Sequence, residues 1–425
     1  MLDIEFIRQH SKKVKKAASQ KQMDPAIVDK VLDLDKKRRD LIFQVDQWRE
    51  KRNEASQARD IKAGKKIKQA LRELEPQLKK LEEEYRQAML MIPNIPYSGA
   101  PIGQGEKDNV VVEKWGKKPH FDFKPQSHIE LGKKLDLLDL EQGVKTAGFR
   151  GYYLKNAAAQ LHFAVLLYAW QKIIAHGFTP MVPPTILREF ALVGSGHFPF
   201  GREDVYQIAN PGKLADGKTI KEENFLAGTA EPALLAYFAD QVLSEEDLPV
   251  KVCGWTPCYR SEAGSYGKDT KGIYRIHEFA KVEQVVLCQA DVKISDQWLD
   301  KMRRYSQEIL EDLKLPYRVI EICTGDMGAG KRKMYDIETW MPSRHAYGET
   351  HSDSNLTDWQ TRRLSIQYKN KAGEKIYAHA LNNTVLASPR ILIAILENYQ
   401  KKDGSIEIPK VLRGLVGKEA IYPKK

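Results

Sequence analysis

The chain has 425 residues, with 68 Lys and Arg against 57 Asp and Glu, and so a formal net charge of +11. Hydrophobic residues make up 42% and charged residues 29%, a balance typical of globular proteins that excludes disorder as the main state. At roughly 100–200 residues per domain, this length predicts two to four domains. The positive balance favours an anionic partner only weakly, because it is small for a chain of this size.

A membrane protein is also excluded by the sequence. The longest apolar stretch, around residues 161–175, contains Gln171 and Lys172 and is too short to span a bilayer. The N-terminus shows no basic start followed by an apolar run, so we expect no secretory signal. Four Cys in this length predict a reducing, cytoplasmic setting, and their spacing fits no zinc site, so no zinc is expected.

The positive charge is concentrated near the N-terminus. Residues 1–92 hold 23 Lys and Arg and 16 Asp and Glu, a net charge of +7. Residues 51–72 alone hold eight basic and two acidic residues, and a solvated face would be the ordinary interpretation of such a run. The basic residues that we expect to contact a polyanion are Arg52, Arg59, Lys62, Lys65, Lys66 and Lys68.

The same region carries the spacing of a helical hairpin. Mostly apolar residues, with Arg38 and Arg52 among them, recur at alternating intervals of three and four along 31–55 and again along 67–92, which is the seam of a coiled coil. The Gly-containing segment 57–66 separates the two runs and predicts one antiparallel arm, roughly 40–45 Å long at ~1.5 Å per residue. Its basic tip favours a long polyanion lying across it. Pro76 is expected to kink or break the second helix.

Residues 91–107 are rich in Pro and Gly and therefore predict a linker after the arm. The remaining residues mix strand-like and helix-like patterns, which predicts an α+β fold. We therefore expect a helical arm with its linker over 1–105 and a second domain over 106–425. Within it, residues 156–176 predict a helix that lies either in the core or at a subunit interface.

Residues 252–283 predict two strands joined by a loop rich in Gly, Ser and Lys. Arg260 and Glu262 follow the first strand two residues apart, while Phe279 and Glu283 lie on or near the returning strand. An Arg here can grip a phosphate through two parallel hydrogen bonds, and a Glu can accept a hydrogen bond from an amine. An ordinary surface hairpin with an Arg–Glu pair would give the same pattern.

Five segments together resemble a known family. Residues 252–283 resemble motif 2 of class II aminoacyl-tRNA synthetases in the form typical of seryl-tRNA synthetases, GFTPMVPP (177–184) resembles motif 1, and LNNTVLASPRILIAILENYQ (381–400) resembles motif 3. FLAGTAE (225–231) resembles the family's serine-binding Thr-Ala-Glu, and residues 92–109 resemble the linker after its helical arm. The resemblance covers nearly the whole chain in the expected order, and implies an antiparallel sheet flanked by helices.

This resemblance implies that L-serine reacts with ATP to give seryl-adenylate and pyrophosphate, and that serine then moves to the 3′ end of tRNA-Ser. The catalytic residues that it implies are Arg260, Glu349 and Arg390. Contacts to ATP are implied for Arg260, Ser261, Glu262, Phe279, Glu349, Ser352 and Arg390. Glu349 and Ser352 are also the implied ligands of Mg²⁺.

The implied serine-binding residues are Thr229, Ala230, Glu231, Arg260, Glu283, Asn382 and Thr384. By the same resemblance the protein is a homodimer whose arm binds the variable arm of tRNA-Ser, and also of the selenocysteine tRNA if the organism has one. Two alternatives remain open: a synthetase-like ligase that loads an amino acid onto a carrier protein, and a non-catalytic RNA-binding paralogue.

The sequence departs from the family pattern at ETHSDSN (349–355). At this place seryl-tRNA synthetases usually show Glu-Val-Ser-Ser-Cys. Here Glu349 is followed by Thr350, His351, Ser352 and Asp353 in the four places of Val-Ser-Ser-Cys. His351 either tunes an ionic contact or is packed or solvated. Residues 325–331, GDMGAGK, match the spacing of a phosphate loop, but Arg332 follows instead of Ser or Thr, so we expect no such loop.

Overall fold

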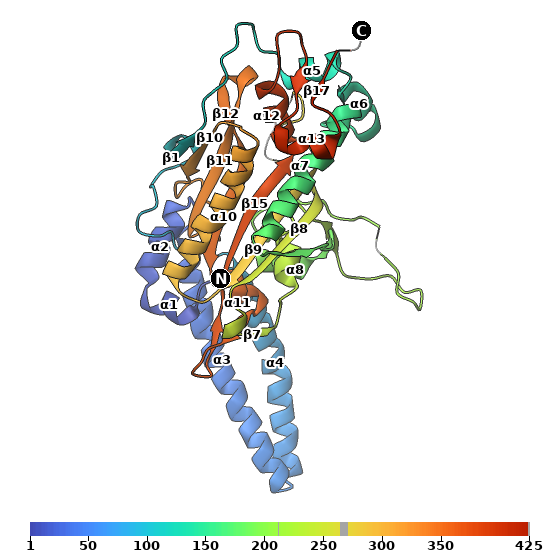
Figure 1. Ribbon diagram of the computed structural model, residues 1–425. Coiled ribbons are helices and arrows are strands. Elements are labelled where there is room, and N and C mark those ends of the chain that lie inside the picture. Colours follow the sequence, from blue (N-terminus) through green and yellow to red (C-terminus); the bar gives the residue numbers. More distant parts are fainter. Residues whose placement is uncertain (211, 264–270, 424–425) are drawn as a thin grey trace. The chain divides into compact units, whose positions relative to one another are not determined.

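The computed structural model describes residues 1–210, 212–263 and 271–423. The chain divides into two compact units, residues 1–95 and 96–425 (Figure 1). Among the described residues, no helix is long and apolar enough to cross a membrane.

The first unit is entirely helical, and two of its helices form the expected arm. It contains α1 (Ile4–Gln9), α2 (Ser11–Gln20), α3 (Ala26–Gln57) and α4 (Ile61–Leu90). Val45 and Ala55 of α3 are buried against Ile67 and Leu71 of α4, as the predicted seam requires. Ion pairs join Arg38 to Glu82 and Arg49 to Glu75, so sequence positions run in opposite directions along the two helices. The predicted antiparallel hairpin is confirmed.

The turn at the tip is shorter than predicted. Helix α3 ends at Gln57 and α4 begins at Ile61, where Asp60 accepts hydrogen bonds from the backbone N–H groups of Lys62 and Ala63. Gly64 is therefore inside α4, because this cap starts the helix three residues before the glycine. The expected break at Pro76 is also wrong, since α4 continues through it. Neighbouring Leu74 and Leu78 pack into the seam and hold the helix across the missing backbone hydrogen bond.

The second unit is built on an eight-stranded sheet in the order β1-β10-β11-β12-β15-β9-β8-β4. All pairs are antiparallel except β4 with β8. In that order the strands are Val110–Trp115, Tyr317–Glu321, Lys333–Met341, Ala346–Thr357, His379–Ser388, Glu278–Cys288, Val250–Tyr259 and Thr179–Met181. The predicted hairpin over 252–283 is thus the pair β8 and β9, and the α+β class is confirmed.

Helices and small strands surround this sheet. The helices are α5 (His128–Lys134), α6 (Leu140–Ala147), α7 (Asn156–Ala175), α8 (Glu189–Ser195), α9 (Glu231–Ala236), α10 (Val292–Asp312), α11 (Thr361–Leu364), α12 (Arg390–Asn398) and α13 (Lys410–Val416). The small strands are β2 (Leu138–Asp139), β3 (Tyr153–Leu154), β5 (Ile186–Arg188), β6 (Asn224–Leu226), β7 (Val242–Ser244), β13 (Gln367–Lys369), β14 (Lys375–Tyr377), β16 (Ile406–Glu407) and β17 (Ala420–Ile421).

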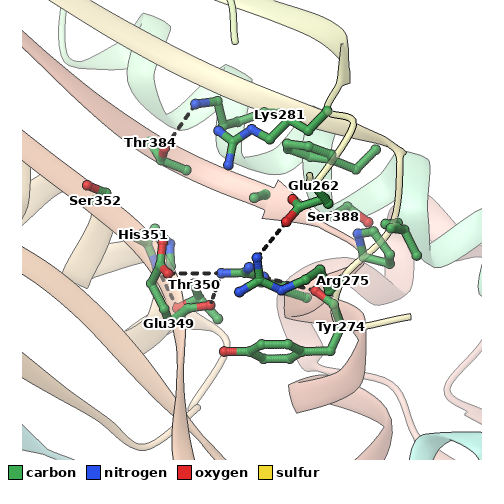
Figure 2. A pocket seen from close by; sticks show the side chains of 16 residues that line it. Glu262, Tyr274, Arg275, Lys281, Glu349, Thr350, His351, Ser352, Thr384 and Ser388 are labelled. Atoms are coloured by element: carbon green, nitrogen blue, oxygen red, sulfur yellow. Dashed lines mark hydrogen bonds and ion pairs between the residues drawn. The ribbon is translucent and has the colours of Figure 1, made fainter. Parts of the chain in front are cut away.

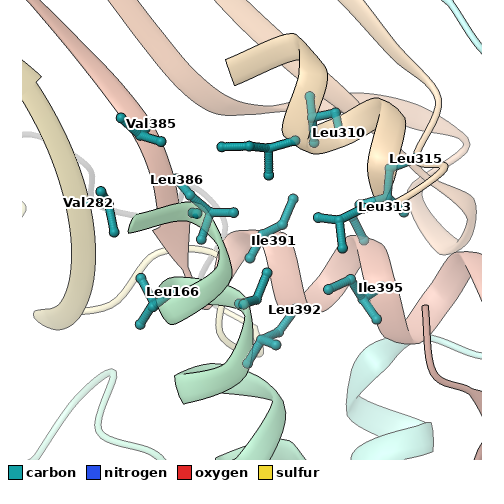
Figure 3. Close-up of a cluster of buried hydrophobic side chains, with 14 of the residues drawn as sticks. Leu166, Val282, Leu310, Leu313, Leu315, Val385, Leu386, Ile391, Leu392 and Ile395 are labelled. Carbon is teal, nitrogen blue, oxygen red and sulfur yellow. The ribbon is translucent and has the colours of Figure 1, made fainter. Parts of the chain in front are cut away.

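The main core lies between one face of the sheet and the helices α7, α10 and α12 (Figure 3). Val282 of β9, Leu386 of β15 and Ile391 of α12 are fully buried there, as is Leu166 of α7. The predicted helix over 156–176 is α7, and its buried side chains belong to this core. Because side chains alternate along a strand, Lys281 and Glu283 point to the opposite face from Val282. That opposite face carries the candidate site.

Candidate functional site

A cavity in the second unit gathers side chains from the ends of β8 and β9, the middle of β12 and the start of α12 (Figure 2). It consists of two adjoining chambers with shared lining residues, a small one of about 60 Å³, called the inner chamber, and a larger one of about 610 Å³, called the outer chamber. The residues that line both are Arg260, Glu262, Arg275, Glu349 and Arg390. Three guanidinium groups therefore face one space, as a site for a polyanionic ligand requires.

Arg260 follows the last residue of β8 and lies at the boundary of the two chambers. Its Nε donates to the carbonyl oxygen of Gly228 over 3.3 Å, and its guanidinium lies 5.2 Å from the centre of the Phe279 ring. Phe279 is the second residue of β9 and also lines the inner chamber. The hairpin thus brings together a cation and an aromatic face that are 19 positions apart in the sequence.

Arg390 begins α12 and is held on two sides. Its Nε donates to the carbonyl oxygen of Tyr274 over 3.1 Å, and its Nη1 lies 3.2 Å from a carboxylate oxygen of Glu349. The Tyr274 ring lies 4.5 Å from the guanidinium. These contacts fix Arg390 at the cavity before any ligand arrives.

Glu262 lies against two arginines. Arg275 donates to its carboxylate, and Arg150 lies 4.0 Å from the same oxygen. Only 11% of the Glu262 side chain is exposed. Its carboxylate is therefore paired, and a ligand that engages it must share it with these guanidinium groups.

Glu231 starts α9, and three polar side chains converge on it. The amides of Asn382 and Gln360 donate to one carboxylate oxygen over 2.7 and 2.6 Å. The backbone N–H of Glu231 donates to the Thr229 hydroxyl over 3.3 Å. The two side chains that donate to the Glu231 carboxylate are therefore neutral amides, so a ligand ammonium would meet no competing cation among these donors.

Glu283 lies on β9 with only 2% of its surface exposed. The ammonium of Lys281 lies 2.5 Å from its Oε2, and the Thr384 hydroxyl lies 3.5 Å from the same oxygen. Burial raises the pKa of Glu283 above the usual value for a glutamate, and the charge of Lys281 opposes that rise. This second carboxylate differs from Glu231 in having a cation of its own.

Glu349 and Ser352 of β12 both line the inner chamber and offer a carboxylate and a hydroxyl oxygen. Partial burial raises the pKa of Glu349, but the charges of Arg390 and Arg260 outweigh this effect, so the pKa lies below the usual value for a glutamate. Asp336 lies opposite Ser352 on the neighbouring strand β11, and its Oδ1 has no hydrogen-bond partner among the described residues. Such a set of oxygen atoms fits Mg²⁺, which takes few protein ligands and fills the rest with phosphate and water.

The segment that departs from the family pattern divides between the two faces of the sheet. His351 is buried, and its Nδ1 lies 2.8 Å from the Thr350 hydroxyl; burial lowers its pKa to about 3. It is therefore a packed, neutral side chain. Asp353 pairs with Asn383, whose amide donates to the Met302 carbonyl of α10, so Asp353 faces the core helices and not the cavity.

The expected site residues are placed as follows. Six of the seven expected ATP contacts line the cavity: Arg260, Glu262, Phe279, Glu349, Ser352 and Arg390. Ser261 does not, because its hydroxyl donates to the carbonyl of Glu203. Among the expected serine contacts, Glu231, Arg260 and Thr384 line it, and Thr229, Glu283 and Asn382 adjoin it through the hydrogen bonds above. The side chain of Ala230 packs into a core cluster with Leu234 and Val285.

The expected polyanion-binding residues Arg52, Arg59, Lys62, Lys65, Lys66 and Lys68 belong to the first unit. All six are exposed around the turn between α3 and α4. The segment 325–331 is not a phosphate loop, because the strand β11 follows it where a helix would be needed. Its Gly328, Ala329, Gly330 and Lys331 line the outer chamber.

Sequence reasoning missed several residues of this cavity. Tyr274 and Arg275 lie on the return of the hairpin, and Lys281 precedes Glu283 by two positions on the same face of β9. That two-residue spacing was a usable signal for Lys281. Gln360 matches the family pattern after residues 349–355, but its contact with Glu231 could not be predicted, because only the folded chain brings the two together.

Comparisons with known proteins agree with this architecture. Residues 1–96 match the model of the seryl-tRNA synthetase N-terminal domain, and residues 214–399 match the class II tRNA synthetase core domain (G, H, P, S and T). The serine–tRNA ligase of Deinococcus radiodurans is 41% identical over 98% of both chains, and that of Treponema denticola is 38% identical over 97% of this chain and 98% of its own. The seryl-tRNA synthetase of Pyrococcus horikoshii, solved with ATP, is 34% identical over the whole of both chains with a TM-score of 0.89.

Proposed function

The chain belongs to the seryl-tRNA synthetase family, and on that premise we propose that it is a serine–tRNA ligase. It activates L-serine with ATP and transfers the seryl group to the 3′ end of tRNA-Ser. One observation carries this proposal most directly. The cavity that gathers Arg260, Arg275 and Arg390 also adjoins the two buried carboxylates Glu231 and Glu283, so a triphosphate and a small amino acid can meet there.

In the first step, a carboxylate oxygen of serine attacks the α-phosphorus of ATP. The bond between this phosphorus and the oxygen bridging to the β-phosphate breaks, giving seryl-adenylate and pyrophosphate. Arg260 neutralises the charge that builds on the α-phosphate, and Arg390 holds the γ-phosphate. Glu262 accepts from the adenine amino group while Phe279 stacks on the ring. This chemistry needs positioning and charge neutralisation, and no protein nucleophile.

Serine binds beside the α-phosphate site. Its ammonium meets Glu231, which Asn382 and Thr229 orient, and its hydroxyl meets Glu283 and Thr384. Ala230 supports this wall from the core, and Arg260 reaches the serine carboxylate from the phosphate side. A site built to bond a hydroxyl rejects the analogue lacking it by roughly 10⁴–10⁵-fold, because its buried polar groups would be left unpaired.

Glu349 and Ser352 would hold Mg²⁺ together with oxygens of the triphosphate. The ion supplies positive charge that stabilises the phosphates during bond breaking. Ser261 contributes from the backbone side of the hairpin, where its hydroxyl fixes the segment after Arg260 to Glu203.

The transfer step requires tRNA. The terminal 3′ ribose hydroxyl attacks the carbonyl carbon of seryl-adenylate, and AMP leaves. The exposed cations Arg52, Arg59, Lys62, Lys65, Lys66 and Lys68 at the arm tip suit the phosphate backbone of the tRNA variable arm. The selenocysteine tRNA, if the organism has one, offers the same kind of long arm. We place the reaction in the cytoplasm, where its substrates are.

A homodimer is part of the proposal. The side chains of Phe163 on α7 and of Val182, just after the edge strand β4, are 61% and 91% exposed in the single chain. Tyr237, just after α9, is also 61% exposed. Large apolar side chains left in water at a sheet edge favour a second copy as the partner. Sedimentation of the purified chain should give twice the mass of 48.6 kDa.

The exchange of labelled pyrophosphate into ATP, measured with each of the twenty amino acids, tests the proposal. We expect exchange with serine only, abolished in Arg260→Ala with tRNA binding retained. Arg304→Ala on the exposed face of α10 is the matched control and should leave exchange unchanged. The absence of serine-dependent exchange would favour a non-catalytic RNA-binding paralogue. Transfer to a carrier protein with no charging of tRNA-Ser would favour a carrier-protein ligase.

A further inference from the structure

Lys281 is a buried cation at the edge of the inner chamber. Only 5% of its surface is exposed, and its ammonium lies 2.5 Å from Glu283 Oε2. The ammonium also donates to the Thr384 hydroxyl over 3.2 Å (Figure 2). Burying the ammonium of a lysine costs free energy unless an opposite charge pairs with it, and here Glu283 supplies that charge. Lys281 and Glu283 are two residues apart on β9 and face the same side of the sheet.

The two carboxylates of the proposed serine site, Glu231 and Glu283, are thereby made unequal. Glu231 accepts hydrogen bonds from the neutral amides of Asn382 and Gln360, and no ion pair joins it to a described residue at the short distance seen for Glu283. Glu283 already has a cation at ion-pair distance. An amino acid with one ammonium and one hydroxyl can enter such a pocket in only one favourable way, with the ammonium at Glu231 and the hydroxyl at Glu283.

We infer that Lys281 is a specificity-determining residue that reserves Glu283 for a neutral hydrogen-bond donor and so excludes amino acids with a cationic side chain. This inference rests on the proposed activation of serine. Without the ammonium of Lys281, Glu283 is a buried carboxylate that lacks a counter-ion. A substrate with a second ammonium would then supply the cation that Glu283 lacks.

The analogue that tests this is L-2,3-diaminopropionate, which carries an amine in place of the serine hydroxyl. In the wild type its protonated side chain meets Lys281 across Glu283, and the two like charges repel each other. In Lys281→Met, which keeps the unbranched stem of the side chain but removes the terminal ammonium and its charge, the substrate ammonium takes the vacated place.

Pyrophosphate exchange is measured with serine and with diaminopropionate for the wild type, Lys281→Met and the control Lys251→Met. Lys251 is a partly buried lysine of β8 that donates to the carbonyl of His176, outside the cavity. We expect kcat/KM for serine to fall at least tenfold in Lys281→Met and the preference for serine over diaminopropionate to fall at least 100-fold. Lys251→Met should keep the wild-type preference.

A preference that changes less than threefold in a folded Lys281→Met would overturn the inference while leaving serine activation intact. If that variant does not fold, the wild type alone decides. Its kcat/KM for diaminopropionate should rise about tenfold per pH unit until the side-chain amine is neutral, while that for serine stays level over the same range. A flat profile for diaminopropionate overturns the inference. A wild type without any serine-dependent exchange contradicts the proposed function itself.

Discussion

Arg390 and Glu349 form an ion pair across the mouth of the inner chamber, with Nη1 3.2 Å from Oε2, and the same nitrogen donates to the Glu349 backbone carbonyl over 3.0 Å. One residue begins α12 and the other lies in the middle of β12, so the pair joins two elements that border the cavity. Half of the Glu349 side chain is exposed, at 49%, whereas Arg390 is 20% exposed. The carboxylate can therefore turn toward a metal ion while the guanidinium stays in place.

The first prediction concerns Arg390. Arg390→Gln keeps a polar side chain and removes the charge, and should lower kcat for pyrophosphate exchange by roughly 10²–10³-fold, the usual loss when one preorganised charge-stabilising donor is removed. Arg318→Gln is the matched control, because Arg318 is also paired with a glutamate, Glu338, on the same sheet but outside the cavity. Equal effects of the two substitutions would assign the Arg390 effect to folding.

The second prediction compares two adjacent asparagines of β15. Asn382 donates to Glu231 on the cavity face, whereas Asn383 donates to the Met302 carbonyl on the core face. Asn382→Ala should raise KM for serine roughly 10–100-fold with little change in KM for ATP, because losing one charge-assisted hydrogen bond costs about 1.5–3 kcal/mol. Asn383→Ala should lower the melting temperature and leave KM for serine as it was. A change in KM from Asn383→Ala alone would reverse the assignment of the two faces.

The third prediction concerns the arm tip. Replacing Lys62, Lys65, Lys66 and Lys68 by Ala should weaken tRNA binding and flatten its dependence on salt, by roughly 0.7–0.9 log units per lost phosphate contact. Serine-dependent pyrophosphate exchange without tRNA should be unchanged. The control replaces four exposed lysines of the second unit, Lys369, Lys371, Lys375 and Lys410. Loss of exchange with tRNA binding intact would show that the tip cations do not serve tRNA.

The spacing of residues in the arm predicted its helices and their pairing, but not the details of its turn or of Pro76. The spacing along residues 31–55 and 67–92 predicted both helices and their antiparallel pairing, because the seam is a local pattern with a fixed period. It did not predict that the turn is only three residues long or that Pro76 remains helical. The cap by Asp60 and the packing of Leu74 and Leu78 decide these points, and propensity alone ranks glycine and proline as breakers.

The cavity shows where sequence reasoning stops. Its motifs predicted Arg260, Phe279 and Arg390, because each lies in a segment with a recognisable pattern. Gln360 and Glu231 are 129 positions apart, and no local pattern links them. For His351 the sequence left open an ionic contact or a packed or solvated side chain. The fold decides between them, because His351 is buried beside Thr350 and is therefore packed.

The last prediction concerns the base of the arm, where Asp35 of α3 receives two hydrogen bonds of 2.8 Å from Arg8 of α1 and one of 3.2 Å from Arg39. Burial alone would raise the pKa of Asp35, but the two guanidinium groups lower it overall. The pKa of Asp35 is therefore lower in the folded chain than in the unfolded chain, where it is about 3.9. Above that unfolded pKa the ionised carboxylate stabilises the fold, and this stabilisation is lost as pH falls through the pKa of the folded state. Asp35→Asn should therefore cost roughly 1.5–3 kcal/mol at pH 7, and this cost should shrink as pH falls through the depressed folded pKa of Asp35. Hydrogen exchange of α1 to α3 in the full chain, followed by mass spectrometry, measures this as about 10–100-fold faster exchange at pH 7. Asp33→Asn on the same helix, whose exposed partner is Lys37, should leave the exchange rates unchanged, and an equal effect of both substitutions would contradict the role of the buried pair.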